Sequence, residues 1–463
     1  MGGETSGAAI AARLDRLPSS WAVWRLVLLI SLGGCFEYYD LMMTAYVSPG
    51  LVRAGVFHAG AKGLFGLTDQ ATFAAATFAG LFIGTLAFSQ VADRFGRRAI
   101  FTASLIWYTA ATLVMASQDT AVGLDVWRFI AGIGIGVELV TIDAYVSEIT
   151  PPPLRGRAFA INQCIQFMAV PVVAFACWRL LPLTPLGIAG WRWVMLAGAG
   201  GAVVVWVIRA GLPESPRWLA QRGRGAEAEV IVRALEERAA RQTGRPLPAP
   251  RPEGVPSASE ARGRFLDIFR PPYLGRTIML SVFNAAQTIG FYGFGNWAPS
   301  LIAAQGQGVT KSLEYSFIIA FAYPAGPLLC SLIADRFERK HQIVAAAIAT
   351  AAFGLLFARQ DAPAALIGLG VAITLSNNLL SFAYHAYQAE LFPTRIRARA
   401  VGFVYSWSRL STVFSSLIIA ALLGAFGTGG VFAFIAAAMG VVVVTIGVFG
   451  PRTAGRSLEE VSG

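Results

Sequence analysis

Long apolar stretches recur along this chain, and they restrict it to very few folds. We count twelve of them, and each is close to the roughly 20 residues that an α-helix needs to cross the hydrocarbon core of a membrane. Lipid offers no partners to backbone N–H and C=O groups, so a chain that crosses it many times does so as helices. The pattern predicts an all-α integral membrane protein with spans near residues 21–48, 71–92, 98–117, 122–147, 157–180, 191–211, 276–302, 313–334, 341–358, 363–389, 399–424 and 428–450.

The composition and the distribution of charge agree with a membrane location. Hydrophobic residues make up 56% of the 463 residues and charged residues 14%, whereas a soluble protein carries about 25% charged residues. The net charge of +11 comes from Arg and Lys residues that cluster in the short loops on one side of the predicted spans. This positive-inside pattern argues against nucleic acid as a partner. It predicts cytoplasmic termini in a multi-pass protein of the cell inner membrane.

The sequence shows no motif for enzymatic chemistry. It has three histidines, no metal-ligand spacing and no nucleophile elbow, so we expect no enzyme activity, no cofactor and no metal. The glycines of GIGIG at 132–136 lie inside a predicted span, where they indicate close helix packing and not a nucleotide loop. The four cysteines lie in apolar stretches and are expected to be packing residues. We expect no cleavable signal, because the first apolar stretch is long enough to span.

A polar segment, 212–275, divides the chain into two similar parts. Residues 1–211 and 276–463 each contain six predicted spans. The segment opens with LPESPRWLAQRGRG and continues as AEAEVIVRALEERAARQ, a predicted amphipathic helix. The prolines of RPLPAPRPEGVPSASEARGR then predict an irregular linker. The predicted organisation is a six-helix bundle, a cytoplasmic linker, and a second six-helix bundle with a short cytoplasmic tail.

Two charged motifs occur once in each part, at the same separation. ADRFGRR and ADRFERK place Asp93 and Asp335 242 residues apart (335 − 93). YVSEITPPPLRGRA and YQAELFPTRIRARA place Glu148 and Glu390 at the same separation. The shared offset indicates two duplicated, parallel halves. Alternating-access transporters use such halves, with the substrate site near the bilayer midplane between them.

These motifs put an acid and several arginines at the predicted cytoplasmic mouth of each half. Such charges can pair across the interface between the halves in one conformation and separate in the other, which would make them a conformational latch. The same arginines also act as topology signals that hold these loops on the cytoplasmic side. The latch residues are Asp93, Arg94, Arg97, Glu148, Arg155, Asp335, Arg336, Glu390 and Arg397.

The sequence resembles the major facilitator superfamily over nearly the whole chain. VADRFGRR looks like the superfamily signature between the second and third helices, and ADRFERK looks like its second copy. WRFIAGIGIGVEL, LPESPRWL, AELFPTRIRA and RTAGRSLEEV resemble the sugar-porter-like branch, which includes metabolite:proton symporters and organic anion and cation transporters. The resemblance implies the major facilitator fold, which is two pseudo-symmetric six-helix bundles.

The resemblance extends to individual charged positions. GGCFEYYD puts Asp40 where similar proton-coupled sugar porters keep their proton-titrating Asp, and WRFIAGIGIG puts Arg128 where they keep its partner. Arg409 follows the Arg of ELFPTRIR, Arg397, by twelve residues. Similar eukaryotic transporters of organic cations have Asp at that position, and those of organic anions have Arg. The sequence resembles the anion transporters there.

The sugar-recognition positions of the resembling porters match only in part. Gln163 and Gln287 are kept, but Val170 stands for a second Gln, Tyr292 for an Asn, and His385 for the Trp that stacks on sugar. These replacements fit a hexose poorly.

Ionisable residues inside predicted spans cost about 2.5–3.5 kcal/mol each on insertion scales, so they are functional candidates. Asp40 and Arg128 lie at similar depths on helices of opposite direction. Protonation of Asp40 would release Arg128 and couple transport to protons; alternatively, the two form a permanent structural pair. Glu37 shares the face of Asp40, and it either titrates or satisfies neighbouring polar groups.

Further candidates lie deeper. Glu138 and Asp143 follow Arg128 on the fourth span, and Asp143 precedes His385 by 242 residues (385 − 143), which places the two at equivalent depths. Asp143 and His385, facing each other across a cavity, would form a proton relay or a gate. Alternatively, Asp143 caps a helix end locally and His385 is a neutral, hydrogen-bonded histidine.

Arg409 lies about ten residues into the eleventh span, too deep for its side chain to reach the membrane surface. It must therefore pair with the substrate or with an internal acid such as Glu37 or Glu138. A guanidinium binds a carboxylate through two hydrogen bonds. Most nearby aromatic residues are expected to pack, and we select Tyr292 and Trp407 as residues that line a pocket for a flat ring.

We therefore predict proton-coupled transport of a small organic anion, aromatic or monocarboxylate, by alternating access. Arg409 would hold the carboxylate, and Asp40 would carry the proton. The partners are then the substrate, protons and the lipid bilayer. The alternatives are proton-coupled sugar or polyol symport, in which Gln163 and Gln287 dominate, efflux of a drug or metabolite, and a membrane sensor that transports nothing.

Overall fold

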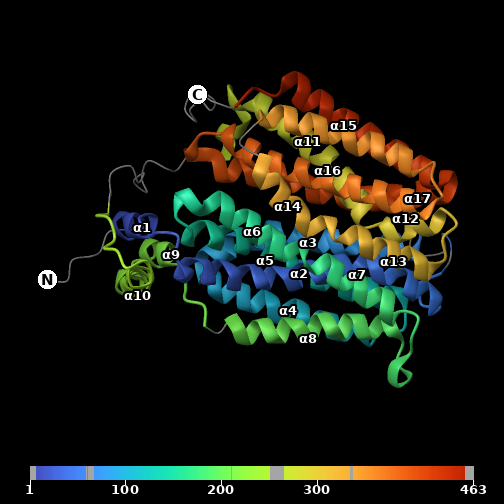
Figure 1. The fold of residues 1–463 in the computed structure, drawn as a ribbon, viewed down its shortest axis with the longest axis horizontal. Coiled ribbons are helices and arrows are strands. Elements are labelled where there is room, and N and C mark those ends of the chain that lie inside the picture. The colour runs from blue at the N-terminus through green and yellow to red at the C-terminus, as the bar shows by residue number, and fades with distance from the viewer. Residues whose placement is uncertain are drawn as a thin grey trace.

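A computed structural model describes residues 7–58, 60, 67–209, 211–250, 265–333 and 337–453. The regular elements in these residues are helices, and the long ones run alongside one another (Figure 1). They are α1 (Gly7–Asp15), α2 (Trp21–Arg53), α3 (Asp69–Phe95), α4 (Arg97–Ala116), α5 (Ala121–Ile149), η2 (Pro152–Leu154), α6 (Arg155–Phe167), α7 (Ala169–Leu180), η3 (Pro185–Gly187), α8 (Gly190–Arg209), α9 (Pro216–Gln221), α10 (Gly225–Thr243), η4 (Phe265–Phe269), α11 (Tyr273–Gly295), α12 (Ala298–Ala304), α13 (Val309–Ala320), α14 (Ala322–Ile333), α15 (Arg339–Phe357), α16 (Pro363–Glu390) and α17 (Thr394–Phe449).

Every predicted span falls on one or two of these helices. Among the described residues, eight helical stretches are long and apolar enough to cross a membrane, judged by length and composition. One of them, Arg399–Phe449, covers the last two predicted spans. The all-helical class is confirmed, while the number of twelve spans and the cytoplasmic termini stay predictions.

Three predicted spans are each interrupted, and each interruption has a proline four residues on. Because proline lacks an N–H, it cannot bond the carbonyl of the residue four positions earlier. Helix α6 ends four residues before Pro171, α11 four before Pro299, and α13 four before Pro324. The predicted spans 157–180, 276–302 and 313–334 are therefore pairs of shorter helices. In α17 the break comes at Gly427, whose φ of 63° and ψ of −161° are not helical.

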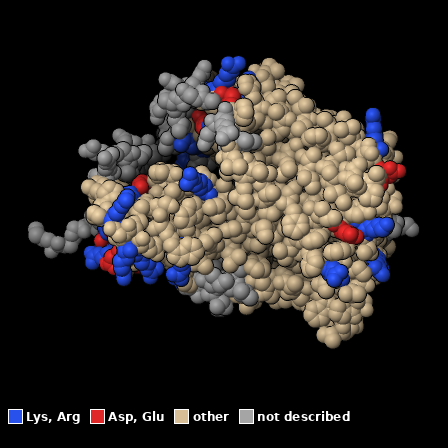
Figure 2. Space-filling model, viewed as in Figure 1, with Lys and Arg blue, Asp and Glu red and all other residues tan. Residues whose placement is uncertain are grey.

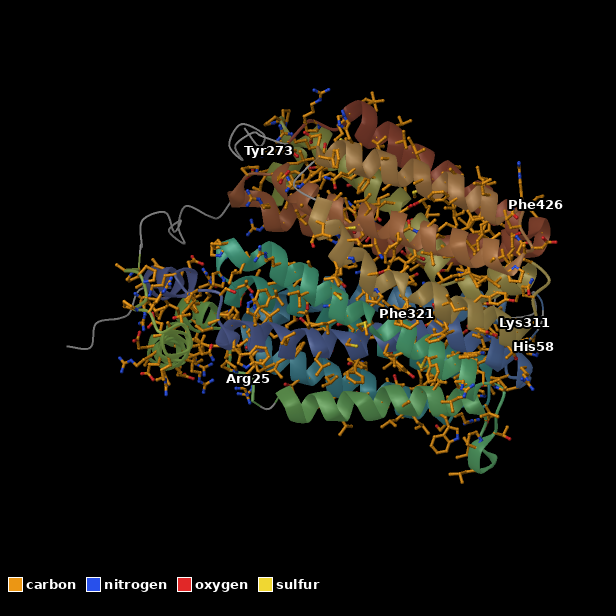
Figure 3. All side chains as sticks on the ribbon, viewed as in Figure 1. Arg25, His58, Tyr273, Lys311, Phe321 and Phe426 are labelled. Carbon is orange, nitrogen blue, oxygen red and sulfur yellow. The ribbon has the colours of Figure 1, made fainter. Side chains whose placement is uncertain are left out.

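The helices form two groups, and the long helices of both groups run along the same direction. In Figure 1, α2 to α8 lie together in the lower part of the view, α11 to α17 lie together in the upper part, and α1, α9 and α10 gather at one end. We call this the linker end. Figure 3 shows Arg25 and Tyr273 toward this end and His58, Lys311 and Phe426 at the opposite end. The predicted linker helix is present as α10, whereas most of the Pro-rich stretch, 251–264, lies outside the described residues.

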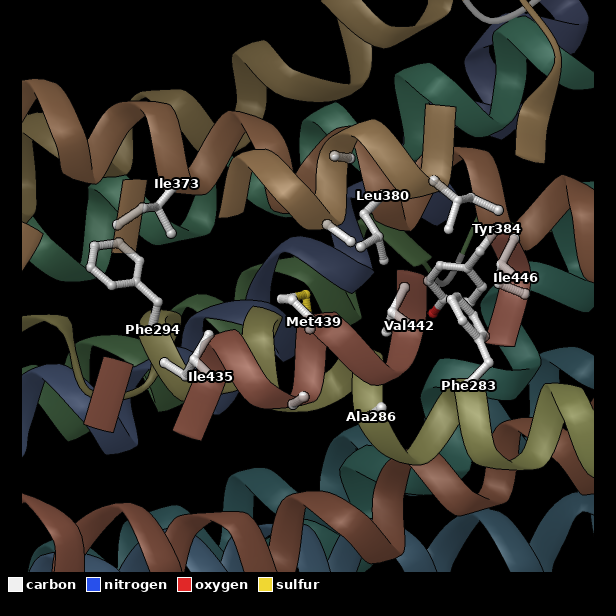
Figure 4. Close-up of a cluster of buried hydrophobic side chains, with 14 of the residues drawn as sticks. Phe283, Ala286, Phe294, Ile373, Leu380, Tyr384, Ile435, Met439, Val442 and Ile446 are labelled. Carbon is white, nitrogen blue, oxygen red and sulfur yellow. The ribbon is translucent and has the colours of Figure 1, made fainter. Parts of the chain in front are cut away.

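Buried side chains form separate apolar cores. The largest lies among α11 to α17 and includes Phe283, Ile373, Leu380, Tyr384 and Met439 (Figure 4). A second core fills α2 to α8 and takes in residues of α11, α13 and α14. On the face drawn in Figure 2, charged side chains gather toward the two ends, and the middle is covered by uncharged residues. This distribution suits a protein whose middle faces lipid.

A third core attaches α1 to the linker. Ile10 and Leu14 of α1 are fully buried in a cluster with Trp218 of α9 and with Val232 and Leu235 of α10. The sequence pattern does not predict this helix, because its few apolar residues lie in an N-terminal segment that also contains polar and charged residues. The first described residues are therefore part of the folded linker end.

Glycines bring α3 and α5 into backbone contact. A Cβ atom added at Gly84 would lie 2.1 Å from the carbonyl oxygen of Ile133, and one added at Gly136 would lie 2.4 Å from that of Leu81. Real Cβ atoms essentially never come so close to another atom. The interpretation of GIGIG as a packing motif is confirmed, and GLFIG at 80–84 supplies the matching small residues on α3.

Candidate functional site

Asp40 and Arg128 form a buried ion pair between α2 and α5. Nη1 of Arg128 donates to Oδ2 of Asp40 over 2.8 Å, Nη2 donates to the Asp40 carbonyl oxygen over 2.6 Å, and Nε donates to Oγ1 of Thr77 over 2.9 Å. The hydroxyl of Thr112 donates to the other carboxylate oxygen of Asp40 over 3.1 Å. Arg128 is completely buried and Asp40 is 3% exposed. The ion pair that the similar depths of Asp40 and Arg128 predict is present, and the hydroxyls of Thr77 and Thr112 provide further hydrogen bonds to it.

Two other acids predicted for proton coupling are also buried. Glu37 is 1% exposed on α2, and Glu138 is 0% exposed on α5. Neither makes an ion pair with Arg409 in the described part of the chain. The two acids therefore belong to the interior of the first half.

Arg409 of α17 lies between two tyrosines, Tyr292 of α11 and Tyr405 of α17, which we call the tyrosine cage. Its Nη1 donates to the hydroxyl of Tyr292 over 2.9 Å, and its Nη2 donates to the hydroxyl of Tyr405 over 3.1 Å. Its Cζ atom lies 6.0 Å from the ring centre of Tyr292 and 5.1 Å from that of Tyr405, within cation–π range. Arg409 is 5% exposed, and within the described residues no carboxylate pairs with it.

Tyr405 is a site residue that the sequence motifs did not indicate. Its position four residues before Arg409 places both side chains on one face of α17, so spacing alone could have indicated it. Tyr292 and Trp407, the two aromatic residues predicted to line a pocket, differ in their surroundings. Tyr292 is part of the cage, whereas the ring of Trp407 packs edge-on against Phe403, 6.4 Å away, and is 40% exposed. The structure brings Tyr292 to Arg409 and places Trp407 with other aromatic residues.

Asp143 and His385 are exposed although they lie on long helices of the bundle. They lie within about two turns of the linker ends of α5 and α16. Nδ1 of His385 contacts the carbonyl oxygen of Ser381 at 2.7 Å, and its ring stacks on Tyr384 at 4.1 Å. Asp143 makes no hydrogen bond or ion pair with any described residue, so a local cap is not seen.

The two glutamines kept from the sugar porters lie on α6 and α11. Gln287 is 5% exposed, and Gln163 is half-buried. Neither side chain makes a hydrogen bond within the described residues. Their amides are therefore available to a ligand.

The predicted latch residues form matching pairs, one in each half. Arg97 of α4 binds Glu148 of α5, with Nη2 2.9 Å from Oε1, and Arg339 of α15 binds Glu390 of α16. Both partners of the second pair follow those of the first by 242 residues. Nε of Arg155 donates to the Thr150 carbonyl oxygen, and Nε of Arg397 donates to the equivalent carbonyl oxygen of Phe392. In this conformation these contacts lie within the halves. The side chains of Asp93 and Arg94, and residues Asp335 and Arg336, lie outside the described part.

Polar and aromatic side-chain contacts join the halves nearer the opposite end. The amide of Gln70 on α3 and the hydroxyl of Ser300 on α12 share hydrogen bonds of 2.8 and 3.0 Å. The rings of Trp178 on α7 and Phe317 on α13 stack with centres 5.7 Å apart. Thus the interface is closed at this end, while Asp143 and His385 are exposed nearer the linker end.

A sequence model of the family described as "Sugar (and other) transporter" matches residues 26–463. The chain is 30% identical to the putative metabolite transport protein YyaJ of Bacillus subtilis (strain 168), over 96% of this chain and 95% of that protein. It is 25% identical to the niacin transporter NiaP of Acinetobacter baylyi (strain ATCC 33305 / BD413 / ADP1), over 98% of this chain and 99% of that protein.

Solved structures show the same fold. The partially occluded inward open conformation of the xylose transporter XylE from E. coli superposes with a TM-score of 0.76 at 20% identity, covering 95% of this chain and 100% of that chain. The match of 95% of the chain thus shows the fold of a major facilitator, with an ion pair in the first half and a caged arginine in the second. The chain belongs to the sugar (and other) transporter family and is a sugar-porter-like membrane transporter of the major facilitator superfamily, not an enzyme.

Proposed function

We propose that the protein is a proton-coupled transporter of a small organic anion, aromatic or monocarboxylate, in the cell inner membrane. The observation that carries this proposal is the tyrosine cage of Arg409. A buried guanidinium without an acid is costly, and tyrosine hydroxyls neutralise it only in part. Its five N–H donors are offered two tyrosine oxygens. A carboxylate that enters from the linker end would supply the missing negative charge.

The similarity to a niacin transporter supports this substrate class, because niacin is an aromatic monocarboxylate. The rings of Tyr292 and Tyr405 beside Arg409 suit a flat substrate. Asp40 then carries the coupling proton. When it is protonated, its attraction for Arg128 is lost, and the contact between α2 and α5 is free to change.

The test is carboxylate uptake into proteoliposomes with an imposed proton gradient, with niacin and benzoate as probes. Arg409→Gln should weaken binding about 100-fold, the loss of two charge-assisted hydrogen bonds of about 1.5 kcal/mol each. The matched control is Arg25→Gln, which removes an exposed arginine at the linker end. Carboxylate uptake that survives Arg409→Gln at the rate of the control would refute the proposal.

Proton-coupled sugar or polyol symport is a second candidate. It is favoured by the unbonded amides of Gln163 and Gln287, which match sugar-recognition positions of similar porters. Under this candidate, Gln287→Ala abolishes uptake of a sugar such as xylose, and Arg409→Gln leaves it intact. The two variants therefore separate the two functions in one assay.

A further inference from the structure

We propose that Tyr292 senses the substrate and couples its binding to the opening of the interface between the halves. The hydroxyl of Tyr292 occupies a donor of Arg409 at the place where the carboxylate would bind. A carboxylate that takes this donor releases Tyr292 and loosens the contact of its ring with the first half. The inference rests on the proposed function, because it takes Arg409 as the carboxylate site.

Tyr292 of α11 connects the arginine to the other half of the molecule. Nη1 of Arg409, in the same half, donates to its hydroxyl over 2.9 Å. Its ring meets that of Phe78 of α3, in the first half, edge to face with the ring centres 4.8 Å apart. Tyr292 is 8% exposed and Phe78 is 1% exposed. One buried side chain therefore makes both the contact that a ligand would replace and a contact that holds the halves together.

Tyr292 belongs to a cluster of aromatic rings that crosses the interface. The ring centre of Phe167, in the first half, lies 5.8 Å from that of Tyr323 and 6.3 Å from that of Phe291, both in the second half. Phe291 continues the cluster to Tyr292, whose ring centre is 5.1 Å away. We call this the ring cluster, and its members are Tyr38, Phe78, Phe167, Phe291, Tyr292 and Tyr323.

The ring cluster lies between the Arg409 site and the contacts at the opposite end. Phe78 follows Gln70 by eight residues (78 − 70), and Tyr292 precedes Ser300 by eight residues (300 − 292). Eight helical residues span about 12 Å, so the rings close the interface deeper than the hydrogen bonds between Gln70 and Ser300 do. A substrate that moves from Arg409 toward the opposite end has to part these rings.

A carboxylate is a stronger partner for Arg409 than a tyrosine hydroxyl. Hydrogen bonds to an ionised acceptor are about twice as strong as those between neutral groups, and a carboxylate bridges two N–H groups of a guanidinium. It therefore competes with Tyr292 at Nη1 and with Tyr405 at Nη2. Tyr405 lies on the same helix as Arg409 and packs against the core of the second half. Only the displacement of Tyr292 reaches the ring cluster.

The experiment measures how benzoate and niacin change the separation of the halves at the opposite end. Spin labels are placed at Arg53→Cys and Lys311→Cys, which are exposed residues on α2 and α13. Lys311 is at the opposite end in Figure 3, and Arg53 ends α2 close to His58 at the same end. The four free cysteines are first replaced by serine, and uptake by this background is verified. In the full-length protein in nanodiscs, either acid should raise the ratio of open to closed distances about fivefold or more, the usual range of coupling between sites.

Tyr292→Phe keeps the ring and removes the hydroxyl. It should leave the open-to-closed ratio unchanged when benzoate is added, because no bond remains for the acid to replace. Benzoate binding should stay equal or become up to about tenfold tighter, since a competing hydrogen bond to a charged group is gone. An ordinary substrate ligand would show weaker binding in this variant. The matched control is Tyr405→Phe, which removes the other hydroxyl from the same arginine and should retain the benzoate response.

Phe78→Leu tests the same coupling from the first half. It leaves the bond between Tyr292 and Arg409 in place and weakens the ring contact across the interface. The open-to-closed ratio without ligand should rise, and benzoate should bind more tightly by the same factor, because coupling between two sites is reciprocal.

Other outcomes overturn the inference in distinguishable ways. If benzoate binds through Arg409 but Tyr292→Phe weakens its binding and retains the opening, Tyr292 is an ordinary ligand and the proposed function stands. The same holds if Tyr405→Phe abolishes the response as well, or if benzoate bound by the unmodified protein leaves the ratio unchanged. If neither acid binds in a way that depends on Arg409, the proposed function fails together with this inference.

Discussion

Arg128 and Arg409 illustrate two ways in which a bundle of this kind holds a buried arginine. Arg128 is paired with Asp40, so its charge is compensated inside one half. Arg409 meets only tyrosine hydroxyls and ring faces among the described residues. The first arrangement suits a proton site, because protonation of one acid breaks the pair. The second suits a ligand site, because the compensating charge has to arrive from outside.

Asp40→Asn should abolish accumulation of substrate against its gradient and spare exchange of substrate across the membrane. The amide cannot release a proton, so the gradient no longer drives a cycle. Arg128 also loses its ion-pair partner, at a cost of about 3–5 kcal/mol for a buried pair. The melting temperature is therefore measured beside uptake.

The control for Asp40→Asn is Glu227→Gln, which breaks the exposed contact with Arg224 and should change neither quantity. Accumulation by Asp40→Asn at the normal rate under external acid would contradict the role of Asp40 in coupling.

At the scale of elements, small residues and ion pairs between helices decide how helices pack. The contact between α3 and α5 depends on glycines that face each other on the two helices. The apolar pattern alone did not indicate which glycines meet. Helix α1 is held against α10 by Arg13 and Arg16, which both bind Glu236. Nη2 of Arg217 binds Asp15 at 2.5 Å and its Nε binds the Glu148 carbonyl oxygen at 2.8 Å, so the linker end is tied to α5 and thereby to the latch pair.

Gly136→Ala should destabilise the protein by about 1–3 kcal/mol, the usual cost of overpacking. The new methyl group would lie 2.4 Å from the Leu81 carbonyl oxygen, and backbone cannot move aside as a side chain can. The control is Gly402→Ala on α17, where a Cβ meets nothing within 4 Å. It should be neutral or stabilising, because alanine favours helix. Equal melting temperatures for the two variants would argue against close packing of α3 on α5.

Acid should loosen α1 from α10. Burial acts to raise the pKa of Glu236, but its hydrogen bonds to Arg13 and Arg16 together lower the pKa below its ordinary value of 4.5. A carboxyl group whose folded pKa is lowered stabilises the fold fully above the unfolded value, and this contribution disappears as the pH falls through the lower folded value. Hydrogen exchange of α1 should therefore accelerate below about pH 4.5, the ordinary value of this group.

The matched variant for this effect is Glu236→Gln, which should show fast exchange of α1 already at neutral pH. Unchanged protection of α1 in Glu236→Gln would show that the apolar contacts of Ile10 and Leu14 hold the helix without the charges.

At the scale of the whole molecule, side-chain contacts join the halves at the opposite end, whereas two candidate residues are exposed nearer the linker end. Gln70 and Ser300 join the halves at the opposite end, and the stacked rings of Trp178 and Phe317 lie on the same interface. Asp143 and His385 are exposed closer to the linker end. Alternating access requires this asymmetry to reverse, so the contacts near the opposite end must break in each cycle.

A disulfide between Gln70→Cys and Ser300→Cys should therefore arrest transport, and a reductant should restore it. Each single variant serves as a control, because it loses the hydrogen bonds without linking the halves. Uptake is measured before and after reduction in proteoliposomes. Transport by the fully cross-linked protein at the rate of the single variants would mean that this interface stays closed throughout the cycle.

The sequence by itself determined the helical class, the positions of the apolar helices and the duplication. These features follow from local hydrophobicity and from motifs repeated 242 residues apart. Both can be read along the chain without knowing which helices pack together. It also indicated the pair of Asp40 and Arg128, because depth along a helix follows from counting residues. The breaks before Pro171, Pro299 and Pro324 were not predicted, because a proline by itself does not end a helix: Pro49 and Pro327 lie inside the continuous helices α2 and α14.

The tertiary structure alone decided which groups meet across the bundle. Rotation of one helix about its axis and the approach of another are set by packing of the whole chain, which no local pattern encodes. For this reason Tyr292 joined the Arg409 cage and Trp407 did not, Thr77 and Thr112 completed the ion pair, and α1 docked on the linker.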